Sequence, residues 1–256
     1  MHGGVSQFMA VRIENPSAGT RLLIIDRPER RNALDRGAYR ALAAAIEETD
    51  HDPDVRAIVI TGSGGVFTSG NDIADFQEPA EPGAPGEGAA MTFLRALALA
   101  RKPILAAVEG FAVGIGTTML LHCDLAFAGS GTRFRVPFVP LGLSPEGGSS
   151  YLLPQVAGLK RATELLLLGD EFDADEAAEA GLINRVVEKG RALEVALDRA
   201  SRLAAAPAES VALTKMLLRR PHLETVLETL DVESEHFAER RRSDEAQAAF
   251  ARFRSK

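Results

Sequence analysis

The sequence has almost no cysteine. Cys123 is the only one in 256 residues, which excludes an internal disulfide and a metal site built on paired cysteines. The five histidines do not fall at a spacing typical of metal ligands, so we expect no metal site. We expect His122 to be a packed or capping residue rather than a catalytic one. Because disulfides mark oxidising compartments, the cysteine content favours a reducing, cytoplasmic location.

Membrane and targeting segments are also missing from the pattern. No apolar run is long enough to cross a bilayer, and the first ten residues lack the basic start and apolar stretch of a signal peptide. The C-terminal Arg254-Ser255-Lys256 is not a peroxisomal address. The formal net charge of -7 disfavours binding to nucleic acid or to anionic membranes.

Several phosphate-binding and nucleophile motifs are absent. The sequence contains neither G-x-G-x-x-G, nor G-x-x-x-x-G-K-[ST], nor G-x-S-x-G. These absences argue against a Rossmann dehydrogenase, a P-loop and a nucleophile elbow. One local basic cluster, made of Arg27, Arg30 and Arg31, could still meet a phosphate-bearing ligand, although a solvated arginine-rich loop explains it equally well.

What is present is an alternation of strand and helix patterns. Two apolar stretches, 8–14 and 20–26, flank turn-forming residues and predict a hairpin. Further along, the patterns alternate: helices at 35–51, 91–100 and 117–122, and strands at 55–60, 104–108 and 124–128. This order predicts an α/β fold with parallel pairing in much of its sheet.

Two later segments break the alternation. Residues 77–90 are rich in proline, glycine and acids and predict a mobile surface loop of the kind that can act as a lid. From residue 158 onward the patterns are helical, except for one short strand near 182–187. We therefore expect a core at 1–198 and a C-terminal helical region at 199–256, whose amphipathic helices pack on a partner subunit or back across the core.

Two glycine-rich loops, 65–73 and 109–116, each follow a predicted strand and open a helix. Such loops leave backbone N–H groups free to bind a ligand oxygen. Tight turns alone explain either loop taken by itself. Two of them after neighbouring strands favour an oxyanion hole with one donor from each loop.

These loops and their surroundings resemble the crotonase superfamily, the enoyl-CoA hydratases and isomerases. The matching stretches are F-T-S-G-N-D-I at 67–73, K-P at 102–103, A-A-V-E-G-F-A-V-G at 106–114, C-D at 123–124, R-N-A-L at 31–34 and A-G-L-I at 180–183. Together they cover nearly the whole chain. The resemblance implies a spiral of repeated ββα units, with C-terminal helices that assemble a homotrimer or a hexamer made of two trimers.

The resemblance also implies residue roles. The backbone N–H groups of Asn71 and Ile115 would hold the oxygen of an acyl-CoA thioester. CoA would lie along two segments that contribute Arg30, Arg31, Ala33, Leu34, Ser69, Gly70, Asn71, Asp72 and Ile73. Because CoA is part of the substrate, no separate cofactor is expected. Phe250 and Phe253 either approach the adenine end of a neighbouring subunit's CoA or belong to the core.

The reaction depends on the carboxylates around the acyl chain. Hydratases of this family use two glutamates, and this sequence has Thr118 and Phe138 at those positions. Glu146 stands instead where hydratases carry glycine. This arrangement resembles the Δ3,Δ2-enoyl-CoA isomerase branch, in which one glutamate moves a proton from carbon 2 to carbon 4. Phe138 and Leu143 would then line the acyl pocket.

Glu146 also has a simpler interpretation. Ser144, Pro145 and an acid in the first turn are typical of a helix start, and this local pattern favours capping over catalysis. The two glycine-rich loops and the missing hydratase acids favour the catalytic base. A helix N-terminus would lower the pKa of Glu146, whereas an apolar pocket would raise it. An enoyl-CoA hydratase and a non-catalytic or RNA-binding scaffold stay open as alternatives, and the acidic charge counts against RNA.

Overall fold

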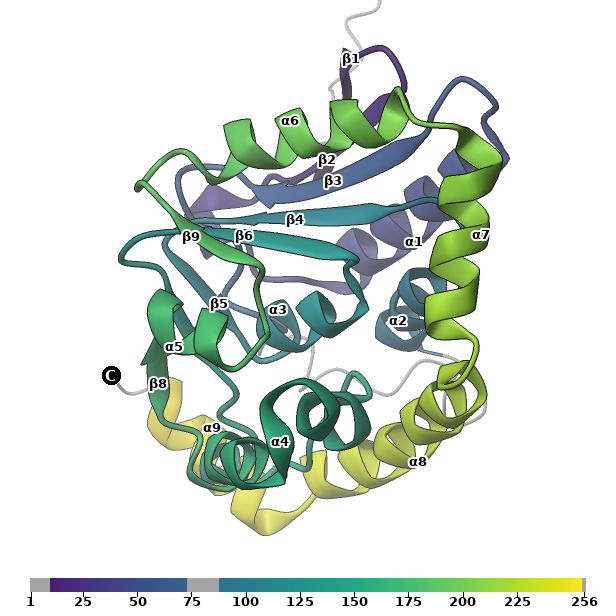
Figure 1. The fold of residues 1–256 in the computed structure, drawn as a ribbon. Coiled ribbons are helices and arrows are strands. Elements are labelled where there is room, and N and C mark those ends of the chain that lie inside the picture. Colours follow the sequence, from purple (N-terminus) through teal and green to yellow (C-terminus); the bar gives the residue numbers. More distant parts are fainter. Residues whose placement is uncertain (1–9, 73–87, 255–256) are drawn as a thin grey trace, which may run out of the picture.

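The main layer of the fold is a six-stranded sheet. It is seen in a computed structural model that describes residues 10–72 and 88–254 (Figure 1). The strand order is β1 (Val11–Ser17), β2 (Thr20–Ile25), β3 (Ala57–Gly62), β4 (Ile104–Val108), β6 (Leu125–Gly129) and β9 (Arg185–Val187). The first pair is antiparallel and the other four are parallel. The predicted hairpin, α/β fold and parallel pairing are confirmed.

The hairpin turn is tighter than the sequence pattern predicts. β1 continues through Asn15 and Pro16, so the turn is confined to Ala18 and Gly19. Pro16 is tolerated because β1 lies at the edge of the sheet, where one missing N–H donor breaks no essential ladder. Gly19 has a φ of 75°, which suits a two-residue turn.

A smaller second layer completes the ββα repeat. Its strands are β5 (Phe111–Val113), β7 (Arg133–Arg135) and β8 (Glu171–Asp173). Two single bridges, Leu34 with Asn71 and Thr68 with Ala112, continue the pattern in the earlier units. A long strand, a short pairing segment and a helix therefore follow one another repeatedly, which confirms the predicted spiral. The sequence pattern predicted none of β5, β7 and β8, because three residues are too short to show a strand period.

Helices cover both faces of the main sheet. α6 (Ala192–Ala204) lies across one face, while α1 (Arg36–His51), α2 (Ala89–Leu99) and α3 (Ile115–Thr118) lie on the other (Figure 1). Ala192, Ala196 and Ala200 of α6 are buried against the sheet. Their spacing of four residues places these small side chains on one stripe of the helix, which allows a close approach. The predicted boundary at 198/199 falls inside α6, and the division into two regions stays a prediction.

The C-terminal helices pack back on the core. α7 (Ala208–Arg219), α8 (Leu223–Arg241) and α9 (Asp244–Arg254) run along one side and the lower edge of the molecule (Figure 1). Lys215 Nζ lies 2.8 Å from Asp124 Oδ2, and a guanidinium nitrogen of Arg219 lies 3.0 Å from Asp124 Oδ1. These ion pairs fasten α7 to the residue that precedes β6. Phe250 is buried in the main hydrophobic core, whereas the side chain of Phe253 lies outside the described part of the chain.

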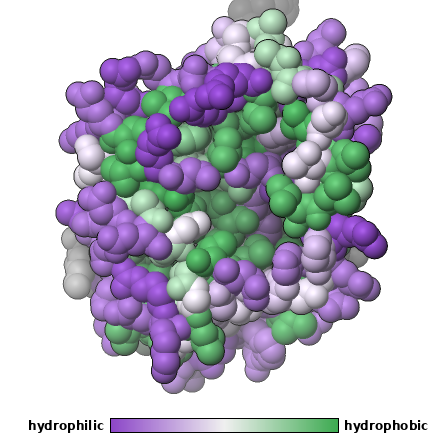
Figure 2. Space-filling model, in the orientation of Figure 1, coloured by the Kyte–Doolittle hydropathy of each residue, from purple (hydrophilic) through white to green (hydrophobic). Residues whose placement is uncertain are grey.

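Hydrophobic side chains remain exposed on α7. Figure 2 shows them on the right-hand side of this face, and Leu213, Met216, Leu217 and Leu218 are the exposed ones. A groove of about 630 Å³ lies beside them, between α2 and the helices α7 and α8.

Within the described residues, no helix is long and apolar enough to cross a membrane.

Candidate active site

Two glycine-rich loops lie side by side where β3 and β4 end. Thr68 donates its N–H to the Phe111 carbonyl at 3.2 Å, and Val113 donates to the Thr68 carbonyl at 3.1 Å. The contact is close enough to demand glycine. A Cβ on Gly70, which has a φ of 87°, would lie 2.5 Å from the Val113 oxygen, and a Cβ on Gly116 would lie 2.5 Å from Thr68 Cγ2. Backbone hydrogen bonds therefore fix the two loops relative to each other.

The two predicted oxyanion donors lie one on each loop. Within the described residues, neither the Asn71 N–H nor the Ile115 N–H donates to a protein acceptor. Their neighbours Gly70, Asp72 and Gly114 all donate to protein oxygens. The backbone thus presents one unused donor on each loop, as an oxyanion hole requires.

The two predicted CoA-binding segments are also brought together. Ser69 donates to the Arg31 carbonyl at 3.1 Å, and Leu34 donates to the Gly70 carbonyl at 2.8 Å. The side chains differ in what they can contact: Arg30 and Arg31 are exposed, Ser69, Asn71 and Asp72 are half-buried, and Ala33, Leu34 and Gly70 are buried. Ala33 and Leu34 can therefore offer a ligand little beyond backbone atoms. Ile73 and residues 77–87 of the expected lid lie outside the described residues.

Arg27 does not belong with the exposed arginines. It pairs with Asp35 at 3.1 Å and with Asp72 at 3.3 Å, and it donates to the Ala33 carbonyl at 2.6 Å. Its charge is therefore used inside the protein, where it holds the two segments together. The basic cluster that faces solvent is reduced to Arg30 and Arg31.

Asn32 shapes the first segment, and sequence reasoning missed its role. It is fully buried, with a φ of 56°, a left-handed conformation that asparagine tolerates better than most residues. Its side chain accepts from the Arg27 N–H at 2.9 Å and donates to the Ser63 and Val66 carbonyls at 2.9 and 2.7 Å. One amide therefore joins this turn to the loop that follows β3.

Glu146 does not lie in a helix. α4 (Ser149–Leu168) begins three residues later, after Gly147 and Gly148, which both have a φ of 71°. The interpretation of Ser144 and Pro145 as a helix start is therefore wrong. Glu233 of α8 replaces the predicted cap, because its carboxylate accepts from the Gly148 N–H at 2.6 Å and from the Ser150 N–H at 2.8 Å.

The carboxyl group of Glu146 is buried, with 8% of the residue exposed. Burial raises its pKa to about 8, a hydrogen bond from Asn71 partly opposes this rise, and the negative charge of Glu233 adds to it. Of the two opposing effects considered from the sequence, the apolar surroundings prevail. A carboxyl group with such a pKa can both accept and return a proton near neutral pH.

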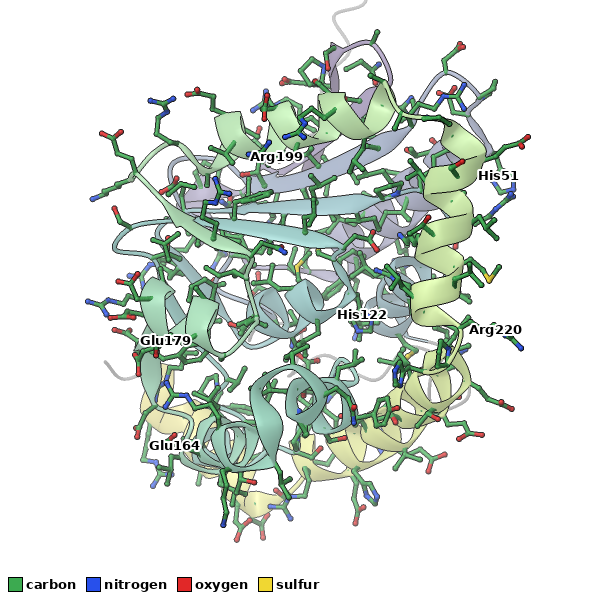
Figure 3. The ribbon with its side chains drawn as sticks, viewed as in Figure 1. His51, His122, Glu164, Glu179, Arg199 and Arg220 are labelled. Atoms are coloured by element: carbon green, nitrogen blue, oxygen red, sulfur yellow. The ribbon has the colours of Figure 1, made fainter. Side chains whose placement is uncertain are left out.

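His122 holds the turn that carries Glu146. Its Nε2 lies 2.8 Å from the Gly147 carbonyl oxygen, which can only accept, so the proton is on Nε2. Burial lowers the pKa of His122 to about 4, and the ring is therefore neutral. Figure 3 shows His122 in the interior, between α3 and α4. It is a packed residue, as predicted.

Thr118 and Phe138, which the resemblance aligns with the two hydratase glutamates, are both buried. Thr118 is buried, and a Cβ on Gly147 would lie 2.7 Å from its hydroxyl oxygen, so this side chain contacts the Glu146 turn. Among the described residues, that hydroxyl has no hydrogen-bond partner. Phe138 is buried with its ring edge-on to Phe237, at a centroid distance of 6.5 Å. Neither position offers a carboxylate that could activate water.

Leu143 and Phe138, which were predicted to line the acyl pocket, lie close to each other. Both are buried, and the Leu143 N–H donates to the Phe138 carbonyl at 2.8 Å. The ring of Phe138 also lies 4.0 Å from where a Cβ on Gly114 would stand, so it reaches the second glycine-rich loop. In the parts of the chain that the structure describes, no cluster of His, Cys, Asp or Glu could hold a metal ion.

Comparison of the sequence with known families identifies the family of this chain. Residues 16–256 match the family described as Enoyl-CoA hydratase/isomerase. The chain belongs to that family. Its relatives include the 1,2-epoxyphenylacetyl-CoA isomerase of Escherichia coli K12, which is 33% identical over 90% of this chain and 88% of that protein. The short-chain-enoyl-CoA hydratase of Clostridium acetobutylicum is also 33% identical, over 85% of this chain and 84% of that enzyme.

Solved structures agree with the family assignment. Pseudomonas aeruginosa OdaA is 42% identical, with a TM-score of 0.92, and the match covers 96% of this chain and 99% of that one. An enoyl-CoA hydratase/isomerase from Pseudoalteromonas atlantica is 39% identical, with a TM-score of 0.91 and coverages of 96% and 97%. This chain therefore shares the crotonase-like fold with proteins that are named as enoyl-CoA hydratases/isomerases.

Proposed function

We propose that the protein is a Δ3,Δ2-enoyl-CoA isomerase that uses Glu146 as its single acid-base group. One observation carries the proposal: Glu146 is a buried carboxyl group whose Oε1 lies 3.4 Å from the side chain of Asn71 on the first glycine-rich loop. Thr118 and Phe138 stand where the resemblance places the hydratase glutamates. A reaction that needs one proton carrier fits this set of side chains. A hydration that needs a positioned and activated water does not.

The proposed reaction has two proton transfers. The Glu146 carboxylate takes a proton from carbon 2 of a 3-enoyl-CoA, and the electron pair of the broken C–H bond spreads over a dienolate. The N–H groups of Asn71 and Ile115 bind the negative thioester oxygen, where one such donor contributes about 3 kcal/mol. The same carboxylic acid then returns its proton to carbon 4, which leaves the double bond between carbons 2 and 3. No metal or further cofactor takes part in these steps.

The test is the conversion of a 3-enoyl-CoA to its conjugated 2-enoyl isomer. We expect Glu146→Gln to lower kcat by about 10²–10⁴-fold, because the amide cannot accept the proton, and to leave CoA binding unchanged. Glu179→Gln is the matched control, since Glu179 is exposed at the end of α5 (Ala174–Glu179) and lies at the surface (Figure 3).

Hydration is the second candidate, because several relatives carry hydratase names. It would be favoured if the protein hydrated 2-enoyl-CoA at a rate that does not depend on Glu146. Absence of turnover with a panel of 2-enoyl and 3-enoyl-CoA substrates would instead favour a scaffold. In either case the proton-shuttle mechanism would be wrong.

We also propose that the chain assembles as a homotrimer or as a hexamer of two trimers. The exposed Leu213, Leu217 and Leu218 of α7 support an association surface in the C-terminal region. Light scattering of the purified protein would give the number of subunits, and a monomeric mass would contradict the proposal.

A further inference from the structure

The side chain of Asn71 lies between a tyrosine and the proposed base. Tyr39 of α1 donates its hydroxyl proton to Asn71 Oδ1 at 2.5 Å. The Asn71 amide nitrogen in turn lies 3.4 Å from Glu146 Oε1. A chain of two hydrogen bonds therefore runs from the hydrophobic face of α1 to the carboxyl group of Glu146.

The two distances fit one orientation of the Asn71 amide. An oxygen-to-oxygen distance of 2.5 Å fits an O–H···O bond, whereas N–H···O bonds are about 2.7–3.2 Å long. Tyr39 is buried and packs on Phe93, with a ring-centroid distance of 5.8 Å, so its hydroxyl has a fixed position. The amide oxygen therefore faces Tyr39, and the NH₂ group faces Glu146.

We propose that Asn71 has a second role. Its side-chain amide is a positioning group that stabilises the ionised form of Glu146 through a hydrogen bond to Oε1, while its backbone N–H donates to the negative thioester oxygen of the substrate. The amide NH₂ can only donate, so it binds a carboxylate better than it binds a carboxylic acid. Glu146 Oε2 is then left to exchange the proton with the substrate. The role of Oε2 rests on the proposed isomerase function, but the hydrogen bond to Oε1 does not.

The other groups around Glu146 do not provide this stabilisation. Glu233 on α8 is an acid, and its charge opposes ionisation of Glu146. His122 is neutral and bonded to the Gly147 carbonyl, and Asp72 is paired with Arg27. Within the described residues, the Asn71 amide is the one hydrogen-bond donor to the Glu146 carboxyl group.

Asn71→Ala tests the role, because it removes the amide and keeps the backbone N–H. A hydrogen bond of 3.4 Å is long, so we expect a modest effect: the pKa of Glu146 rises by about 0.5–1 unit. Since the base must be ionised, the rising limb of kcat/KM against pH moves upward by the same amount. At pH 7 this corresponds to a loss of about 3- to 10-fold.

Tyr39→Phe tests the other end of the chain of hydrogen bonds. Without the hydroxyl the amide is free to turn, and we expect a shift in the same direction that is smaller than in Asn71→Ala. The sequence contains only two tyrosines, and the second provides a matched control. Tyr151 donates to or accepts from His222 Nδ1 at 2.7 Å, and Tyr151→Phe should leave the pH profile unchanged.

Direct titration separates this inference from the proposed function. The ¹³C resonance of the Glu146 carboxyl group, assigned by its loss in Glu146→Gln, reports the pKa without any substrate. An unchanged pKa in both Asn71→Ala and Tyr39→Phe would overturn the inference. A raised pKa in a protein with no isomerase activity would retain the hydrogen-bond role and reject the proposed reaction.

Discussion

The two glycine-rich loops, which form the proposed oxyanion hole, and the Glu146 turn are built in different ways. The loops present backbone atoms, and they are fixed by hydrogen bonds and glycines between residues 65 and 116. The Glu146 turn presents a side chain and is held by two buried residues, His122 and Glu233. Glu233 lies 85 residues after the Gly148 N–H that it binds. The proposed oxygen-binding half of the site is therefore local, whereas the position of the proposed base depends on the C-terminal helices.

The largest expected difference between the two halves is in their response to pH. The pKa of Glu146 rises from 4.5 to about 8 on folding, so the native state binds more protons than the unfolded state in that range. Ionisation of Glu146 should therefore reduce the free energy of unfolding as pH rises from 4.5 to 8, by on the order of 4 kcal/mol. The oxyanion loops act through uncharged backbone groups and add no such dependence.

Urea unfolding of the wild type and of Glu146→Gln at pH 5, 7 and 9 measures this effect. The variant lacks the buried ionisable group, so its relative stability should increase with pH. A constant difference across the three pH values would show that Glu146 titrates normally and would contradict its burial.

The second test perturbs the contact between the two glycine-rich loops. Gly70→Ala would place a Cβ 2.5 Å from the Val113 carbonyl oxygen, so the two loops must separate. We expect kcat to fall by about 10²–10³-fold, the loss typical of removing one oxyanion donor. Gly131→Ala is a matched control, because its φ of 86° is close to the 87° of Gly70 but nothing lies within 4 Å of the new Cβ.

Gly131→Ala should cost only backbone strain, roughly 1 kcal/mol in the free energy of unfolding, with an unchanged kcat. Equal losses of activity in the two variants would show that backbone strain, rather than the contact between the loops, controls the oxyanion hole.

The third and smallest effect concerns the Glu146 turn, which is held by α8. The two carboxylate oxygens of Glu233 accept from the Gly148 and Ser150 N–H groups. In Glu233→Gln one of these oxygens becomes an NH₂ group, which cannot accept the hydrogen bond. We expect the free energy of unfolding to fall by roughly 2 kcal/mol, with a decrease in kcat because the Glu146 turn is less firmly held. Glu235→Gln, at an exposed position of the same helix, is the control for changing the charge.

If Glu233→Gln lowered stability and left kcat unchanged, the turn would not depend on the cap from α8. The contrast between a local oxyanion hole and a base positioned from a distance would then fail.

The same contrast explains what could be predicted from the sequence. The six strands of the main sheet and the hairpin follow from local periodicity and turn chemistry, and the structure confirms them. The second glycine-rich loop is confirmed only in part, because its residues Phe111–Val113 form β5. Ser144, Pro145 and Glu146 carry an equally good local signal for a helix start, and it is wrong. Two glycines with a φ of 71° follow Glu146, and the cap comes from another helix. No local pattern contains that information.

The roles of Tyr39 and Asn32 were missed for a related reason. Tyr39 occupies an apolar position of the predicted helix α1, and nothing in its spacing indicates that its hydroxyl reaches the Asn71 side chain. Asn32 lies within a recognised motif, but its three hydrogen bonds become visible only in the folded chain: one is to Arg27 in the same turn, and two are to the loop that follows β3. The prediction succeeded for backbone-encoded features and failed for side-chain contacts between distant segments.

The contact between Glu233 and α4 has a consequence for how the protein is made. During synthesis the two glycine-rich loops leave the ribosome about a hundred residues before α8 does. The Gly148 and Ser150 N–H groups then lack the Glu233 carboxylate as their acceptor until α8 has emerged and docked. A nascent chain that stops before Glu233 would therefore carry the oxygen-binding loops without a properly held base, and catalytic competence would arise only with the last helices.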